Sequence, residues 1–323
     1  MSLALTWLLI GVFLKTSIAD MFIDIPNHRS AHVDPVARIG GLALITTALG
    51  IALYLVNEPI IILLNMVALG LMVISLIDDR IGLSAKLRLV IHLAAAVEII
   101  WFSQQGNLLV MILLVGAITW MTNLFNFMDG ADGFAGGMAV VGFGAYAAAA
   151  SMAGDQDLLL LSGVIAAASL GFLMWNFPPA KMFLGDCGAI PLGFLAAGVG
   201  LIGYERGAWG ISYPVLVFLP FIFDATLTLL KRLIAGKNIF KAHREHVYQA
   251  LSELPGWSKR RLVCSAYLLM FVIAASALGV ETASGHELIW TAGLLLGWLA
   301  VLSLIAMITA RSVRHQAQTA ADR

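Results

Sequence analysis

The sequence predicts an all-α, polytopic integral membrane protein with about 11 transmembrane helices, about ten being the alternative count. Two features of its composition predict this fold class. Hydrophobic residues make up 60% of the 323 residues and charged residues only 12%, with a mean hydropathy of +0.92. A soluble domain usually carries about 25% charged residues, and a bilayer-spanning helix needs about 20 mostly apolar residues. The composition therefore excludes a secreted domain, a nucleic-acid-binding module and a disordered chain.

Apolar runs long enough to span a bilayer recur along the chain and predict a single membrane domain over residues 1–323. They lie near 3–19, 39–56, 59–77, 86–102, 107–122, 134–153, 157–175, 189–203, 209–229, 262–280 and 288–309. The run at 189–203 is the shortest, and leaving it out gives the lower count. The first run lacks the basic segment of a signal peptide, so we expect it to remain as a span. Cys187 and Cys264 are too few for a disulfide framework and lack the spacing of a metal site.

The basic residues lie almost entirely on one side of this predicted topology. Of the 19 Lys and Arg residues, 17 fall in loops after odd-numbered spans or in the C-terminal tail, whereas Arg206 follows an even-numbered span. The positive-inside rule makes the odd loops cytoplasmic and the N-terminus extracytoplasmic. The longest of these loops, over residues 230–261, is strongly basic.

The odd loops also carry nearly every polar motif, which predicts an active site at the cytoplasmic face rather than a midplane site of the transporter kind. The first odd loop holds Arg29, His32 and Arg38, which could bind phosphate or could only orient the protein. The second begins with Asp78 and Asp79 at the end of a span. Paired carboxylates suit Mg²⁺ binding or proton abstraction, and a charged cap paired to the following arginine is the alternative.

The third odd loop is the richest in polar groups. Asn123, Asn126, Asp129 and Asp132 recur at every third residue, and a glycine follows each aspartate. Neighbours three apart share a helix face, but this set drifts too far for one regular helix, so we expect the backbone to bend or end at the glycines. The glycine N–H groups could cradle a diphosphate. In a chain so poor in charge, the set predicts a functional site, with a polar turn as the alternative.

Two further loops and one span add candidate ligands. Asp186 lies between glycines just before a span, where it could approach a metal or phosphate, or cap the next helix. His243, Arg244 and His246 in the 230–261 loop could bind metal or donate hydrogen bonds to phosphate. Attraction to anionic lipid explains the surrounding Lys and Arg residues equally well. Asp224 lies in the ninth span, about one turn from its cytoplasmic end, as a site residue or as a side chain that reaches the interface.

In order along the chain, these motifs resemble the polyprenyl-phosphate N-acetylhexosamine-1-phosphate transferases, which form glycosyltransferase family 4 and are related to the peptidoglycan translocase. The resemblance runs from residue 20 to about residue 250. It comprises Asp24-x-Pro followed by Arg38-x-Gly-Gly, Asp78-Asp79, Asn-x-x-Asn-x-x-Asp-Gly-x-Asp-Gly over 123–133, Asn176 with the following Pro-Ala-x-x-Phe-x-Gly-Asp over 179–186, and the histidine motif. The histidine motif looks closest to the O-antigen-initiating branch that handles UDP-N-acetyl-fucosamine or -quinovosamine. Ala189 stands where the family often has serine.

The resemblance implies a role for each candidate residue. The catalytic carboxylates would be Asp78, Asp79, Asp129 and Asp132, one of the first pair deprotonating the lipid phosphate. Asp186 and Asp79 would bind Mg²⁺, for which Mn²⁺ could substitute. The substrates would be bound by Asn123, Asn126, Asn176, Arg38, Lys86, His243, Arg244 and His246. Within that set, Lys86 would lie at the lipid phosphate.

The implied reaction transfers an N-acetylhexosamine-1-phosphate from a UDP-sugar to undecaprenyl phosphate and releases UMP. It would initiate O-antigen or cell-surface polysaccharide synthesis at the bacterial inner membrane, with a periplasmic N-terminus and a cytoplasmic C-terminus. The implied partners are the two substrates and the lipid bilayer, with no nucleic acid; a homodimer, the identity of the sugar and a covalent intermediate stay open. A transporter or flippase for an anionic lipid or sugar is the alternative, because it would share the hydropathy.

Overall fold

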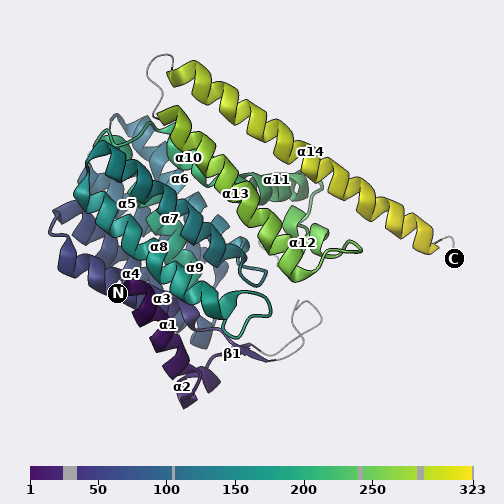
Figure 1. Ribbon diagram of the computed structural model, residues 1–323, viewed down its shortest axis with the longest axis horizontal. Helices are drawn as coiled ribbons and strands as arrows, with labels where there is room; N and C mark the ends of the chain where they lie inside the picture. Colours follow the sequence, from purple (N-terminus) through teal and green to yellow (C-terminus); the bar gives the residue numbers. More distant parts are fainter. Residues whose placement is uncertain (25–34, 104–105, 239–242, 282–286, 322–323) are drawn as a thin grey trace.

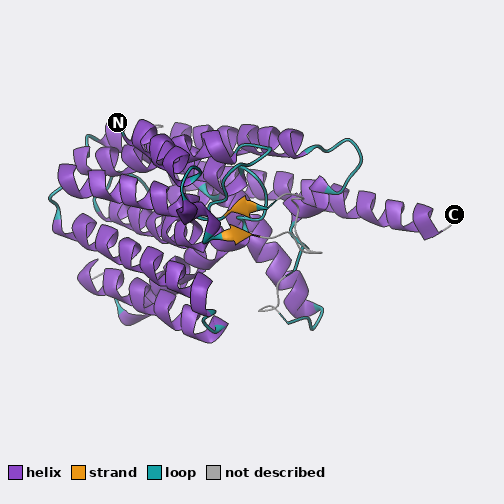
Figure 2. Cartoon of the chain, turned by 90° about the horizontal axis from the view of Figure 1, so that it is seen from below, coloured by secondary structure: helices purple, strands orange, loops and turns teal. Residues whose placement is uncertain are grey.

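Each apolar run coincides with one helix or a pair of helices in the computed structural model, which describes residues 1–24, 35–103, 106–238, 243–281 and 287–321 (Figure 1). The helices are α1 (Ser2–Phe13), α2 (Ser17–Asp20), α3 (Gly40–Leu55), α4 (Pro59–Ile81), α5 (Ala85–Ser103), α6 (Leu108–Phe127), α7 (Phe134–Ala153), α8 (Gln156–Asn176), α9 (Asp186–Glu205), α10 (Ser212–Val217), α11 (Leu219–Ile234), α12 (Val247–Ser252), α13 (Lys259–Glu281) and α14 (Glu287–Ala321). Strands β1 (Ile23–Asp24) and β2 (Val36–Ala37) pair antiparallel. Figure 2 shows that helices make up nearly all of the chain and that loops flank the two short strands.

The predicted fold class is confirmed: the chain is an all-α, polytopic membrane protein. Within the described ranges, seven helices are long and apolar enough to cross a membrane, namely α4, α6, α7, α8, α9, α13 and α14. Helices α1 and α3 are apolar but shorter. Helix α14 projects well beyond the other helices in both views (Figures 1 and 2).

The helix boundaries differ from the predicted runs at three places. The first run is interrupted between α1 and α2, and the ninth is divided into α10 and α11 next to Pro220, which lacks a backbone N–H. The predicted loop over 230–261 begins inside α11, contains α12 and ends inside α13. Asp78, Asp79, Asn123 and Asn126 lie on the last turns of α4 and α6, so these side chains are held by helices rather than by loops.

The shortest predicted run forms the centre of the bundle. Helix α9 packs against α3, α4, α6 and α7. In its apolar 18-residue stretch, 89% of the residues are buried, against 61% in the corresponding stretch of α7. A side chain on Gly41 would place its Cβ 2.3 Å from the Gly188 backbone nitrogen, so α3 and α9 touch backbone to backbone. This close approach needs glycine on both helices.

Backbone hydrogen bonds extend this contact into the connections before both helices. The Gly41 N–H donates to the Leu184 carbonyl (2.8 Å), and the Phe183 N–H donates to the Ala37 carbonyl (2.8 Å). Arg38 precedes α3 and Asp186 begins α9. The hydrogen bonds between these two segments therefore hold the two side chains next to each other.

Candidate active site

A network of arginines and carboxylates joins the ends of α4, α5 and α9 with the segment before α3. The Arg38 guanidinium donates a hydrogen bond to Asp186 and lies 3.8 Å from an Asp79 carboxylate oxygen. Arg88 Nη1 lies 3.4 Å from Asp78 Oδ2 and 3.8 Å from Asp186 Oδ2. Burial opposes the charge of Arg38, but Asp186 and Asp79 outweigh it and raise the arginine's pKa. The Arg38 guanidinium therefore stays cationic among carboxylates from α4 and α9.

The end of α4 explains how the two halves of this network meet. Gly82 adopts a left-handed conformation (φ 69°) that ends the helix, and the Leu83 N–H donates to Asp78 Oδ1 (2.6 Å). The chain therefore turns back directly into α5, which carries Arg88 to the carboxylate of Asp78.

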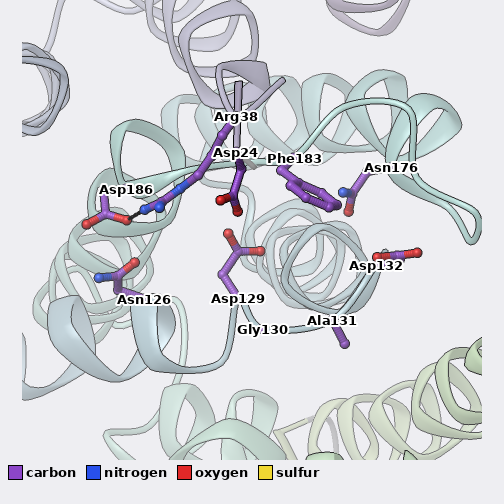
Figure 3. Close-up of a pocket in the computed structure, with 10 residues that line it drawn as sticks. All are labelled: Asp24, Arg38, Asn126, Asp129, Gly130, Ala131, Asp132, Asn176, Phe183 and Asp186. Carbon is purple, nitrogen blue, oxygen red and sulfur yellow. Dashed lines mark hydrogen bonds and ion pairs between the residues drawn. The ribbon is translucent and has the colours of Figure 1, made fainter. Parts of the chain in front are cut away.

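A polar cavity of about 310 Å³ opens beside this network (Figure 3). It is lined by Asp24, Arg38, Asn126, Asp129, Gly130, Ala131, Asp132, Asn176, Phe183 and Asp186. Figure 3 shows the carboxyl groups of Asp24 and Asp129 pointing toward one another, with Arg38 reaching across to Asp186. Burial raises the pKa of Asp129 to about 8, helped by the charge of Asp186 and opposed by Arg38. The cavity thus combines a cationic group with a carboxyl group that is largely neutral at pH 7.

Two of the predicted site residues at this cavity also hold loops together. Asn176 accepts from the Gly133 N–H and donates to the Met182 carbonyl, both at 2.8 Å. Asp132 accepts from the Lys259 ammonium (3.1 Å) at the start of α13. These contacts fix the turn after α6 against the connection between α8 and α9.

A second, mostly apolar cavity of about 480 Å³ forms a groove between α5, α6 and α11. It is lined by Ala85, Arg88, Leu89, His92, Leu93, Gly116, Thr119, Trp120, Asn123, Asn126, Phe127, Ile190, Leu229, His243 and His246. Asn126 also lines the polar cavity, so the two cavities meet at this side chain. The groove therefore leads from apolar helix faces to a set of cationic and amide groups.

Two histidines at the groove are held through their Nδ1 atoms. His92 Nδ1 lies 3.2 Å from Asn123 Oδ1, while the Asn123 amide donates to the Thr119 carbonyl (2.7 Å). His246 Nδ1 lies 3.2 Å from Asp224 Oδ1. His243 stacks on His246 with ring centroids 5.0 Å apart. Burial, with nearby His246 and Arg232, lowers the pKa of His243 to about 4, so this ring is neutral at pH 7.

The structure does not bring every predicted residue to the cavities. Lys86 is exposed and lines neither cavity, whereas Arg88 lines the groove. Residues two apart on a helix do not share a face, which explains the difference. Arg244 is exposed and lies 3.9 Å from Glu253, outside both linings. The predicted phosphate ligands Arg29 and His32 lie outside the described residues.

The sequence interpretation missed several residues that the structure places at the cavities. Arg88 and His92 are one turn apart on α5 and share a face, a spacing visible in the sequence. Asp24 and Phe183 reach the polar cavity from segments that become neighbours only through the contact between α3 and α9. Both residues stand in motifs that carry the family resemblance, but the sequence interpretation gave neither of them a role.

Together, the fold and the cavities define a polytopic membrane protein with a polar, arginine- and aspartate-lined site joined to an apolar groove. Residues 60–204 match the model of glycosyl transferase family 4. The probable undecaprenyl-phosphate N-acetylglucosaminyl 1-phosphate transferase of Bacillus subtilis is 30% identical over 280 residues, covering 81% of this chain and 78% of the relative. The chain belongs to this family, as the sequence motifs predict.

Two further relatives show the breadth of the similarity. The undecaprenyl-phosphate alpha-N-acetylglucosaminyl 1-phosphate transferase of Thermotoga maritima is 28% identical, covering 82% of this chain and 87% of the relative. The phospho-N-acetylmuramoyl-pentapeptide-transferase of Staphylococcus saprophyticus is 30% identical, covering 70% and 78%. The similarity thus extends over most of each protein.

Proposed function

We propose that the protein transfers an N-acetylhexosamine-1-phosphate from a UDP-sugar to undecaprenyl phosphate and releases UMP. The observation that carries this proposal is the meeting of the two cavities at Asn126. A reaction between a water-soluble nucleotide sugar and a very apolar lipid needs one polar site and one apolar site whose ends coincide. The names of the relatives support the same pair of substrates.

The apolar groove suits the lipid acceptor. Its lining on α6 runs from Gly116 to Phe127, twelve residues of helix or about 17 Å, so it would hold the first part of a long polyprenyl chain. At its inner end Arg88 supplies a permanent cation and a planar group of donors that matches phosphate geometry. The lipid phosphate would therefore lie beside Arg88, next to Asp78.

The polar cavity suits the nucleotide sugar. Phe183 offers a ring face against which a uracil could stack, and Arg38 offers donors to a diphosphate. The neutral carboxyl group of Asp129 would donate a hydrogen bond and would not repel a phosphate. We place this end of the bundle at the cytoplasmic face, where UDP-sugars are found.

The carboxylates of this end fit a hard divalent cation. Among the described residues, no three His, Cys, Asp or Glu side chains lie close enough to form a protein-only metal site. Mg²⁺, however, is usually bound by one or two carboxylates together with substrate phosphates. Asp186 and Asp79 already share one cationic group, the guanidinium of Arg38, which supports them as the residues that would hold Mg²⁺ or Mn²⁺. When bound, the metal would neutralise the diphosphate.

The chemistry is positioning and charge stabilisation. An oxygen of the lipid phosphate attacks the phosphorus bonded to the sugar, a new P–O bond forms, and the bond to the UMP oxygen breaks. Asp78, paired to Arg88, lies where it would take a proton from the lipid phosphate. Arg38 would stabilise the charge that gathers on the departing UMP.

The names of the relatives and the histidine motif both bear on the identity of the donor sugar. The relatives above are named for N-acetylglucosaminyl and N-acetylmuramoyl-pentapeptide groups, which supports an N-acetylhexosamine. The histidine motif looks closer to the branch for UDP-N-acetyl-fucosamine or -quinovosamine, so O-antigen initiation stays a prediction. A panel of donors decides between these sugars.

The test is UMP release by the detergent-purified protein with undecaprenyl phosphate, Mg²⁺ and a panel of UDP-N-acetylhexosamines. We expect UMP only when both lipid and metal are present, and none after chelation of the metal. The best donor identifies the sugar. Lack of UMP with every donor, from folded protein that binds lipid phosphate, would favour transport or flipping of an anionic lipid over transfer.

A further inference from the structure

We propose that Asp224 is a positioning residue that fixes the tautomer and orientation of His246, and this inference rests on the transfer reaction proposed above. The aspartate lies on α11 and the histidine directly precedes α12, 22 residues later. His246 lines the apolar groove, whereas Asp224 does not. The aspartate would thus act on the reaction only through the histidine.

The contacts of Asp224 are those of an anchored carboxylate. Oδ1 lies 3.2 Å from His246 Nδ1 and accepts hydrogen bonds from the Val247 N–H (2.9 Å) and the Thr228 hydroxyl (3.1 Å). Oδ2 accepts from the Tyr248 N–H (3.0 Å). Asp224 and His246 are 6% and 3% exposed, so water competes little for these bonds. A carboxylate held by several donors has one orientation and imposes it on its neighbours.

The contact with Asp224 determines which ring nitrogen of His246 carries the proton. An ionised carboxylate only accepts hydrogen bonds, so the histidine nitrogen facing it must carry the proton. The proton therefore resides on Nδ1, and Nε2 is the nitrogen presented to the groove. There, Nε2 can accept a proton from a phosphate or, once protonated, donate to one, and in either state the ring points the same way.

A purely structural reading assigns Asp224 to capping α12, because Val247 and Tyr248 begin that helix. That reading accounts for the two backbone hydrogen bonds but not for the imidazole contact. It also predicts that replacing Asp224 costs the same activity whether or not residue 246 is histidine. The two readings are therefore separable by experiment.

The first experiment is spectroscopic and needs no activity. Nitrogen NMR of ¹⁵N-histidine-labelled protein in detergent, with the His246 signals assigned by their loss in His246→Gln, reports which ring nitrogen carries the proton. We expect Nδ1 to be protonated, and Nε2 to be the nitrogen that lacks a proton in the neutral ring. The opposite tautomer in the unaltered protein would overturn the proposal, even if Asp224 variants failed to fold.

The second experiment is a double-mutant cycle on UMP release. Asp224→Asn should lower kcat by about 10–100-fold, as loss of a hydrogen-bonding partner of a functional histidine typically does, with a smaller change in either KM. His246→Gln should cost a similar factor, and the double variant should be no worse than His246→Gln alone. Thr228→Val is the matched control, because it removes one hydrogen bond to the same carboxylate without touching the histidine.

The outcomes distinguish the two proposals. Equal losses from Asp224→Asn in both backgrounds, or a loss as large in Thr228→Val, would make Asp224 a helix cap and overturn this inference. Failure of the unaltered protein to release UMP would count against the proposed transfer reaction, while the tautomer measurement would still decide whether Asp224 positions His246.

Discussion

Arginines pair with carboxylates at both ends of the helix bundle, and the two arrangements differ in what surrounds them. At the end away from the cavities, Arg206 lies 3.3 Å from Glu58, 3.3 Å from Asp155 and 3.6 Å from Asp157. Glu58 and Asp155 are the residues that precede α4 and α8, and Arg206 follows α9. This cluster holds three helix ends together, and its charged groups pair with one another.

At the other end, the charged groups line cavities. Arg38 lines the polar cavity and Arg88 lines the groove, while both lie close to Asp186. Identical residue types thus form a clamp at one end and a site at the other. The polar cavity and the groove are lined by the arginines of the second arrangement and not by Arg206, a difference that no composition or charge count reveals.

The largest difference between the two ends should appear when one aspartate is neutralised at each. Asp186→Asn removes a carboxylate from the site and should lower the rate of UMP release by about 100–1000-fold, the scale of losing one electrostatic contact to a transition state. Asp155→Asn removes a carboxylate paired to Arg206 and leaves a good helix cap. Its rate should stay within about twofold of the unaltered protein, because an end without substrate contacts is not limiting.

Both rates are measured at saturating donor, together with the thermal unfolding midpoint of each protein in detergent. A similar loss in both variants at unchanged stability would contradict the assignment of the site to one end. Loss of folding in Asp186→Asn would show instead that this network also serves as a clamp.

A smaller effect should distinguish Arg88 from Lys86, two basic residues of α5, in the kinetics of the lipid acceptor. Arg88→Ala should raise KM for the lipid acceptor and lower kcat/KM by about 10–100-fold, the value of a hydrogen bond to a charged group. Lys86→Ala should have a much weaker effect, because Lys86 is exposed and lines neither cavity. The comparison is made by acceptor titration at fixed donor. A larger loss from Lys86→Ala would favour the role implied by the sequence resemblance over the structure.

The pH dependence of donor binding should report the neutral carboxyl group of Asp129. Its pKa, raised to about 8 from the usual 3.8, keeps the group protonated below pH 8 and lets it ionise above. A new negative charge near a diphosphate costs about 1 kcal/mol, so affinity for the UDP-sugar should fall about fivefold between pH 7 and 9. Calorimetry in metal-free buffer measures this. Asp129→Asn should abolish the fall, and an equal fall in that variant would assign it to another group.

The fold class could be predicted from local patterns in the sequence. The apolar runs and the one-sided motifs correctly predicted a polytopic bundle, because helix length and burial in lipid are properties of short segments. The convergence of Asp78, Asp129 and Asp186 on one end followed from counting spans. The shortest run became the most buried of the seven long apolar helices of the described residues, because its glycines allow its backbone to contact that of α3.

The direction of each side chain did not follow from its position along the chain. Asn123 and Asn176 carry the residue type expected to bind substrate, yet both hydrogen-bond within the protein. Arg88 took the position expected of Lys86, since two residues along a helix turn a side chain to another face. Asp224 meets His246 only because α11 and α12 fold against each other. Such choices depend on tertiary contacts.

The smallest effect should come from breaking the clamp. Arg206→Gln removes ion pairs whose partners Glu58 and Asp157 are more than a third exposed, so we expect a loss of about 1 kcal/mol of stability and little change in activity. The difference in unfolding midpoint between variant and unaltered protein should shrink at high salt, because exposed ion pairs are screened. A salt-independent loss would mean that Arg206 stabilises through packing. A loss of UMP release at unchanged stability would show that the helix ends it joins transmit their position to the site, and the two ends of the bundle would then have to be treated as one unit.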